Sequence, residues 1–183
     1  ISAIENGAKA IVSESIPKKY ENSVTYIQVK NSRESLALIS SNFYDNPSSK
    51  LKLVGITGTN GKTTTATLMF QLFKLFNRKV GLISTNKIII HDHEYESNLT
   101  TPDPINLNKK LFQMVEMDVE YCFMEVSSHA IDQKRIFGLN YNVGVFTNLT
   151  HDHLDYHINF SKYRDVKKIF FDFLNHNSIA IIN

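Results

Sequence analysis

The chain has 183 residues, 42% of them hydrophobic and 21% charged, which is typical of a globular protein with room for one domain or slightly more. Its net charge of +2 creates no strong electrostatic field, so we expect no nucleic-acid partner. Cys122 is the only cysteine and no apolar run approaches the roughly 20 residues that span a bilayer, so we expect a cytoplasmic protein without disulfide or membrane insertion.

Residues 1–44 are predicted to form a helix, two strands and a second helix. The strands are expected at Ala8–Val12 and Thr25–Val29. Asn31 with Glu34 three residues later resembles a capping box, which indicates a helix start. In that helix Leu36, Ile39 and Phe43 fall on one face. The turn-rich segment 45–49 marks the predicted domain boundary, with a first domain over 1–46 and a second over 47–183.

Residues 51–183 alternate between strand and helix patterns. Strands are predicted at 51–56, 79–84, 120–126, 141–147 and 178–182, and helices at 62–76, 105–116 and 161–174. Asp103 and Pro104 suit an N-cap followed by proline at the first helical position. Residues 87–96 are expected to form an inserted hairpin. This alternation predicts an α/β fold with a mostly parallel sheet flanked by helices, in which ligands bind beyond the carboxyl ends of the strands.

A phosphate-binding loop is predicted directly after the strand at 51–56. Gly58 to Thr64 read GTNGKTT and lead into the helix at 62–76. Backbone N–H groups and the helix dipole favour an anion there, while Lys62 adds a cation and the next hydroxyl can ligate Mg²⁺. The common pattern has four residues between its glycines, whereas Gly58 and Gly61 have two between them. The loop therefore predicts nucleoside triphosphate binding and points away from GTPases.

Three further polar clusters follow predicted strands, at 100–103, 125–129 and 147–153. By the strand-end rule all of them could meet the phosphate loop at one cleft. Glu125 closes an otherwise apolar strand, where a carboxylate is costly unless it is paired or binds a metal. Such enzymes hold Mg²⁺ with the loop hydroxyl and an acid from another strand, and Glu125 is the best candidate. The alternative is a strand-end glutamate that faces solvent.

His151, His153 and His157 form a dense cluster with Asp152 and Asp155. Such a cluster suggests a metal site, and a transition-metal hydrolase is one alternative. The hydrolase pattern H-x-H-x-D-H fails by one residue because Tyr156 precedes the last histidine. We expect one of the three histidines to be a ligand, with the others capping the next helix or filling the surface.

The segments GTNGKTT, TTPDP, MEVSSHAIDQKR and TNLTHDHLDYH resemble, in this order, the Mur ligases of peptidoglycan synthesis, above all their MurE type. SRESLALISSNFYDNP also resembles the end of the first domain of that family, so the resemblance covers essentially the whole chain. It implies that 1–46 are the C-terminal part of the UDP-substrate domain and 47–183 the N-terminal part of the central ATPase domain. The C-terminal amino-acid-binding domain is then absent, and the chain alone is expected to be inactive. A monomer is expected.

The resemblance implies ATP-dependent amide formation. The D-glutamate carboxylate of UDP-MurNAc-L-Ala-D-Glu attacks the γ-phosphate, an acyl phosphate forms, and the amine of meso-diaminopimelate or L-lysine displaces phosphate. Phosphorylation is needed because a carboxylate would otherwise have to expel oxide. Bringing two anions together requires cations between them, which Lys62 and two Mg²⁺ sites would supply.

The resemblance also assigns residues. Lys62, Glu125, His153 and Lys167 would form the catalytic set. Thr63 and Glu125 would hold one Mg²⁺, and His153 with a carbamylated Lys167 would hold the second. The family has a carbamylated lysine fourteen residues after this histidine, and Lys167 lies fourteen residues after His153. The predicted ATP-phosphate contacts are Gly58, Thr59, Asn60, Gly61, Lys62, Thr63 and Thr64. The predicted contacts to the UDP-muramoyl dipeptide are Thr100, Thr101, Ser127, Gln133 and Arg135.

Two positions depart from the family pattern, because His151 stands where arginine is frequent and Leu99 where some members have asparagine. A folylpolyglutamate-synthase-like ligase remains an alternative function, since GTNGKT alone would admit it. A non-catalytic ATP-binding fragment is another alternative.

Overall fold

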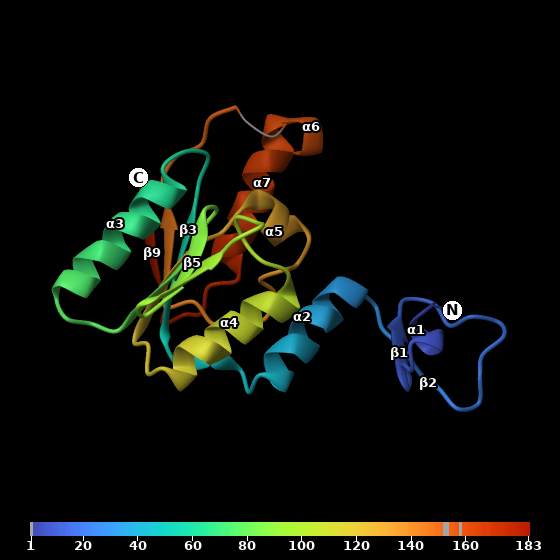
Figure 1. Cartoon of the computed structure of the whole chain (residues 1–183). Coiled ribbons are helices and arrows are strands. Elements are labelled where there is room, and N and C mark those ends of the chain that lie inside the picture. The colour runs from blue at the N-terminus through green and yellow to red at the C-terminus, as the bar shows by residue number, and fades with distance from the viewer. Residues whose placement is uncertain (1, 152–153, 158) are drawn as a thin grey trace.

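The computed structural model describes residues 2–151, 154–157 and 159–183, with main-chain structure only at 154 and 155. It consists of a small N-terminal unit and a larger α/β unit (Figure 1). The small unit contains α1 (Ser2–Glu5) and the parallel strands β1 (Ala10–Ser13) and β2 (Thr25–Gln28), followed by α2 (Ser32–Phe43). The predicted order of helix, strand, strand and helix is confirmed.

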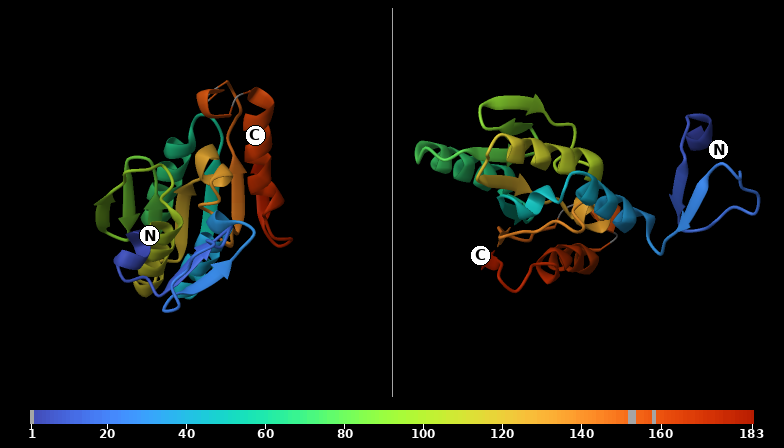
Figure 2. Two further views of the ribbon diagram at one scale, coloured as in Figure 1. Left: turned by 90° about the vertical axis from the view of Figure 1, so that its right-hand side faces the viewer. Right: turned by 90° about the horizontal axis from the view of Figure 1, so that it is seen from below.

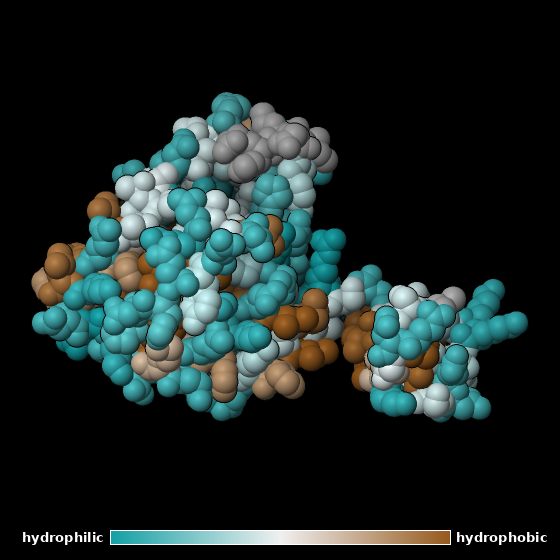
Figure 3. All heavy atoms as spheres, in the orientation of Figure 1, coloured by the Kyte–Doolittle hydropathy of each residue, from teal (hydrophilic) through white to brown (hydrophobic). Residues whose placement is uncertain are grey.

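Helix α2 joins the two units. At its start Asn31 accepts hydrogen bonds from the amides of Arg33 and Glu34, as the capping prediction requires, while the carboxylate of Glu34 lies 3.2 Å from Lys134 in the larger unit. Its apolar face is not a core face, since Leu36, Ile39 and Phe43 are exposed. The packed side of α2 is made of small residues instead, and apolar side chains gather on the surface at the junction of the units (Figure 3).

A seven-stranded sheet forms the centre of the larger unit, in the order β6-β5-β4-β7-β3-β8-β9. The five strands from β4 to β9 in this order are parallel, and β5 and β6 are antiparallel, as the hairpin prediction required. The mostly parallel sheet is therefore confirmed. The strands are β3 (Lys52–Thr57), β4 (Val80–Ile83), β5 (Lys87–Ile90), β6 (His93–Glu96), β7 (Tyr121–Glu125), β8 (Val143–Phe146) and β9 (Ile179–Ile182).

Helices cover both faces of the sheet (Figures 1 and 2). On one face α3 (Lys62–Leu75) packs Ala66 and Phe70 against Ile56 of β3. On the other face lie α4 (Pro104–Glu116), α5 (Ser128–Asp132) and α7 (Phe160–Asp172), over a core that includes Leu53 and the buried Cys122. Burial raises the pKa of the Cys122 thiol, as expected for a structural cysteine.

Three short helices were not predicted, namely η1 (Pro47–Ser49), α5 and α6 (Leu154–His157). They are three to five residues long, too short for a periodic apolar pattern to develop. In the part of the chain that the structure describes, no helix is both long and apolar enough to cross a membrane.

Candidate active site

The phosphate loop lies between β3 and α3, as predicted, and two of its backbone positions require glycine. Gly58 has φ +147°, and a Cβ there would lie 2.0 Å from the Thr147 hydroxyl oxygen. Gly61 occupies the N-cap position of α3 with φ +85°, a backbone conformation that favours glycine, although a Cβ there would meet nothing within 4 Å. The loop leads directly into the N-terminus of α3, whose dipole and free amides favour an anion.

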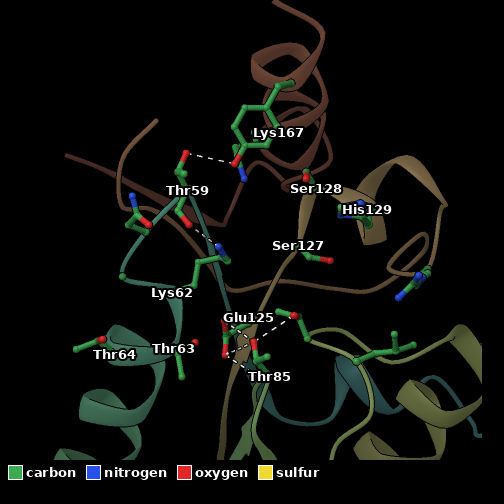
Figure 4. Close-up of a pocket in the computed structure, with 16 residues that line it drawn as sticks. Thr59, Lys62, Thr63, Thr64, Thr85, Glu125, Ser127, Ser128, His129 and Lys167 are labelled. Atoms are coloured by element: carbon green, nitrogen blue, oxygen red, sulfur yellow. Dashed lines mark hydrogen bonds between the residues drawn. The ribbon is translucent and has the colours of Figure 1, made fainter. Parts of the chain in front are cut away.

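Two lysines donate hydrogen bonds to the same carbonyl of this loop, and both side chains lie beside the pocket (Figure 4). Lys62 Nζ donates to the carbonyl oxygens of Gly58 at 3.0 Å and Thr59 at 2.8 Å. Lys167 Nζ, from α7, donates to the same Gly58 oxygen at 2.8 Å, and its side chain is 3% exposed. Lys167 Nζ also lies 4.5 Å from the centre of the Tyr163 ring. Of the two adjacent lysines in α7, Lys167 is therefore the buried one, whereas Lys168 is exposed and pairs with Asp172.

These groups line a pocket of about 520 Å³ at the carboxyl ends of the strands. A pocket of this size can hold a nucleotide-sized ligand. Of the residues predicted for the site, it brings together Thr59, Asn60, Gly61, Lys62, Thr63, Thr64, Thr100, Glu125, Ser127, Arg135 and Lys167. Three further predicted residues do not line the pocket but form hydrogen bonds with residues that do: Gly58 with Lys62, Thr101 with Ser127, and Gln133 with Arg135.

Glu125 turns its carboxylate towards this pocket and is 1% exposed, so the solvent-facing alternative is wrong. Its Oε1 atom accepts a hydrogen bond from the Thr85 amide at 2.9 Å. The Thr85 hydroxyl lies 3.4 Å from both carboxylate oxygens and 3.1 Å from the Thr100 hydroxyl. Glu125 and Thr63 therefore offer oxygen donors in one pocket, which is the donor chemistry that Mg²⁺ prefers.

The cluster that follows β8 supports the phosphate loop from behind. The side chain of Asn148 accepts from the Asn60 amide at 2.9 Å, and the Thr147 hydroxyl donates to the Asn60 carbonyl at 2.7 Å. The Thr59 hydroxyl accepts from the Thr150 amide at 2.9 Å. Three of the four predicted clusters thus line the pocket, and the described part of the fourth fixes the conformation of the loop.

The histidines differ in environment. His151 is exposed and its ring stacks on Phe160, with 4.7 Å between ring centres. His157 is 4% exposed, and its Nε2 atom lies 2.9 Å from the Ser128 hydroxyl. His153 lies outside the described residues, so its assignment as a metal ligand stays a prediction. Among the described residues, no group of three histidine, cysteine, aspartate or glutamate side chains could hold a metal ion. The hydrolase alternative involves His153 and therefore also stays a prediction.

Arg135 is held by three hydrogen bonds. Its Nε and Nη2 atoms donate to the side-chain oxygen of Gln133, at 2.9 and 2.6 Å, and its Nη1 atom donates to the Thr101 carbonyl at 2.9 Å. Thr101 in turn donates from its hydroxyl to the carbonyl of Glu125 at 2.8 Å and accepts from the Ser127 amide at 3.1 Å. Thr101 and Gln133 therefore support the predicted substrate residues Ser127 and Arg135, which line the pocket.

Sequence reasoning missed Thr85 and Tyr163, which also line the pocket, and it assigned no individual role to Ser128 and His129 of the predicted cluster 125–129. Thr85 follows β4 directly, so the strand-end rule could have identified it. Tyr163 lies one helical turn before Lys167, and its hydroxyl is 3.2 Å from that of Thr59. This spacing places both side chains on the same face of α7.

The comparisons with known proteins agree with this geometry. The family described as the Mur ligase middle domain matches residues 56–183. The UDP-N-acetylmuramoyl-L-alanyl-D-glutamate–2,6-diaminopimelate ligase of Cytophaga hutchinsonii is 55% identical over 98% of this chain, and that of Bacteroides fragilis is 52% identical over 100% of it. A solved structure of an enzyme with the same name superposes with a TM-score of 0.81 at 26% identity, covering 100% of this chain and 36% of that one. The chain spans only 37% and 38% of the length of the first two relatives. It belongs to the Mur ligase family and carries the family's middle domain.

Proposed function

We propose that this chain is part of an ATP-dependent ligase that adds 2,6-diaminopimelate to UDP-MurNAc-L-Ala-D-Glu through an acyl phosphate in peptidoglycan synthesis. The observation that carries the proposal is the convergence of the phosphate loop, Glu125, Lys167 and Arg135 on one pocket. The names of two relatives with more than 50% identity favour diaminopimelate over L-lysine. Residues 1–46 would contribute to the UDP-substrate domain and 47–183 to the ATPase domain.

Gly58 to Thr64 would bind the ATP phosphates. The open N-terminus of α3 and Lys62 offer positive charge where the phosphates would lie. To reach a phosphate, Lys62 would exchange its hydrogen bonds to the Gly58 and Thr59 carbonyls for bonds to phosphate oxygens. The ammonium group would then stabilise the negative charge at the γ-phosphate during attack.

Two Mg²⁺ ions would neutralise the phosphates and the attacking carboxylate. Thr63 and the buried Glu125 would hold the first. His153 and Lys167 would hold the second, provided that Lys167 carries a carbamate, since an ammonium group offers no lone pair to a metal. The burial of Lys167 in the wall of the same pocket supports this assignment.

Thr100, Thr101, Ser127, Gln133 and Arg135 would bind the UDP-muramoyl dipeptide. Arg135 is the strongest candidate for its carboxylate, because guanidinium groups bind carboxylates through two parallel hydrogen bonds. A carboxylate at Arg135 would share the pocket with ATP, so both reactants would face the same cations. We infer a cytoplasmic enzyme that acts as a monomer on small molecules.

A folylpolyglutamate-synthase-like ligase is the second candidate, since it would use the same phosphate loop. It is less favoured because Arg135, held by the Thr101 carbonyl, lines the pocket and the two relatives are named as diaminopimelate ligases.

The test uses the full-length protein that contains this chain. It would be incubated with ATP, Mg²⁺, UDP-MurNAc-L-Ala-D-Glu and, in parallel reactions, diaminopimelate, L-lysine or no amine. We expect ADP release and a new amide with diaminopimelate. Absence of product with both amines would refute the ligase assignment. In a separate reaction with ATP, dihydrofolate and glutamate, formation of product would favour the second candidate.

A further inference from the structure

The side chain of Gln133 can adopt only one amide orientation here. Arg135 is a donor without acceptor capacity, so the Gln133 atom that faces its Nε and Nη2 groups must be the oxygen. The amide nitrogen then points the other way and donates to the Tyr156 hydroxyl oxygen at 3.3 Å. Gln133 is therefore a link between Arg135 and Tyr156, and its oxygen is committed to the guanidinium.

The same reasoning fixes the direction of the next bond. The Tyr156 oxygen accepts from Gln133, and the Tyr156 hydroxyl in turn donates a hydrogen bond to a carboxylate oxygen of Asp132, 2.7 Å away. A carboxylate ends the series as a charged acceptor, which strengthens the bond. Four residues, Arg135, Gln133, Tyr156 and Asp132, thus form a relay in which every donor and acceptor is determined.

Tyr156 belongs to a different segment from the other three residues. Its ring packs on His129, with 4.1 Å between ring centres, and on His157 at 4.8 Å. It lies in α6, which begins at Leu154, immediately after the proposed metal ligand His153 in the sequence. The hydroxyl of Tyr156 therefore connects the segment of the metal ligand to the orientation of Arg135.

We propose that Tyr156 is a positioning residue that fixes the guanidinium of Arg135 for the acceptor carboxylate by holding Gln133 in place. This inference rests on the proposed function for the identity of the carboxylate. Two hydrogen bonds to Gln133 and one to the Thr101 carbonyl leave the outer Nη hydrogens of Arg135 to bind a substrate. Without the Tyr156 hydroxyl, Gln133 could rotate, and Arg135 would lose two of its three supports.

Tyr156→Phe in the full-length protein removes the hydroxyl and keeps the ring on His129. We expect the KM for UDP-MurNAc-L-Ala-D-Glu to rise about tenfold, because a misaligned guanidinium binds the carboxylate less well. The KM for ATP and the melting temperature should stay near those of the wild type. Tyr95→Phe is the matched control, since Tyr95 is 36% and Tyr156 37% exposed, and its kinetics should not change.

A double-mutant cycle tests whether Tyr156 acts through Gln133. In a Gln133→Leu background the relay is already broken, so Tyr156→Phe should have no further effect on the KM for the dipeptide. Independent, additive effects would overturn the proposal. Equal increases in both KM values together with a lower melting temperature would also overturn it, because they would indicate a merely structural role.

A measurement without substrate separates this inference from the proposed function. The Nε–H group of Arg135 is protected by its bond to Gln133, so its exchange with solvent, followed by NMR, should accelerate about tenfold in Tyr156→Phe. Unchanged exchange would overturn the relay even if the ligase assay succeeds. Failure of the wild type in the ligase assay would refute the proposed function and leave the exchange result to decide on the relay.

Discussion

Gly58 occupies a position at which an added side chain would collide with Thr147 and the backbone of Asn148. Its φ of +147° favours glycine, and a Cβ would lie 2.0 Å from the Thr147 hydroxyl oxygen. We expect Gly58→Ala to lose about 1–3 kcal/mol of unfolding free energy and to bind ATP much more weakly, because the loop must move to relieve the contact. Urea unfolding and nucleotide titration would measure both effects.

Gly7→Ala is the control for that variant. Gly7 also has a positive φ, of +90°, but a Cβ there would meet nothing within 4 Å, and it lies in the small unit. It should lose some stability through backbone strain alone and leave ATP affinity unchanged. Normal ATP binding by Gly58→Ala would contradict our description of the loop.

Lys167 is the residue for which we propose a covalent modification, a carbamate on its side-chain nitrogen. In the full-length enzyme we expect Lys167→Ala to reduce kcat by at least about 100-fold, since a charge-stabilising group would be lost. Short carboxylic acids such as acetate should partly restore activity by supplying the missing oxygen ligand. Lys168→Ala is the matched control, because Lys168 is exposed and pairs with Asp172. Unchanged activity of Lys167→Ala would refute the carbamate assignment.

Helix α4 depends on a charged cap next to the predicted substrate threonines. Asp103 accepts from the amides of Ile105 at 3.0 Å and Asn106 at 3.1 Å. Burial acts to raise the pKa of this carboxyl, but the bonds from the Asn106 side chain and both amides outweigh it and hold the pKa below its usual range. A lowered pKa means that the charged cap stabilises the folded protein at neutral pH and loses this effect as the pH falls through the folded-state value.

We therefore expect Asp103→Ala to cost about 1 kcal/mol at pH 7 and progressively less below about pH 4. Unfolding of both proteins from pH 7 to pH 3 would measure the difference. Asn31→Ala at the start of α2 is the control, because Asn31 is an uncharged cap that accepts two equivalent backbone hydrogen bonds. Asparagine does not titrate, so the loss of unfolding free energy in this variant should not change through protonation of the cap as the pH falls. A pH-independent cost for Asp103→Ala would contradict the expectation.

At the level of elements, the sequence predicted the strands and the long helices and missed the short helices η1, α5 and α6. The strands 51–56 and 120–126 were found because buried parallel strands appear as apolar runs. The helix α4 was found from Asp103 and Pro104, which act locally. Helix α5 was missed because its cap, Ser127, was interpreted as a substrate contact, although its hydroxyl also accepts from the Ala130 amide.

The same limit applies to the site. Lys62 could be predicted from the phosphate-loop motif, Glu125 because a carboxylate is unusual in an apolar strand, and Arg135 from the resemblance to the Mur ligases. The relay through Gln133 and Tyr156 could not, because the two residues are 23 positions apart and only tertiary contacts, such as that of the Tyr156 and His129 rings, bring them together. The orientation of a side chain between two such segments depends on tertiary contacts that leave no periodic signal.

The molecule as a whole gathers most of the predicted site residues at one edge of the sheet, while the chain spans 37% of the length of one relative. We expect the 183-residue chain alone to bind ATP with Mg²⁺ but to form no amide, because the relatives contain more chain than this one. Calorimetric titration with ATP and the product assay would measure the two properties. Amide formation by the chain alone would contradict this expectation.

The carbonyl oxygen of Gly58 receives an ammonium group from each side, from Lys62 and from Lys167. Two like charges that share one acceptor repel each other, and this repulsion is poorly screened where Lys167 is buried. Reaction of the Lys167 amine with dissolved carbon dioxide would yield a carbamate and release protons, which changes the local charge from +1 to −1. The repulsion from Lys62 would then become attraction. The loop lysine that would bind ATP would thereby also favour the modification that prepares the metal site, and activity would depend on dissolved carbon dioxide.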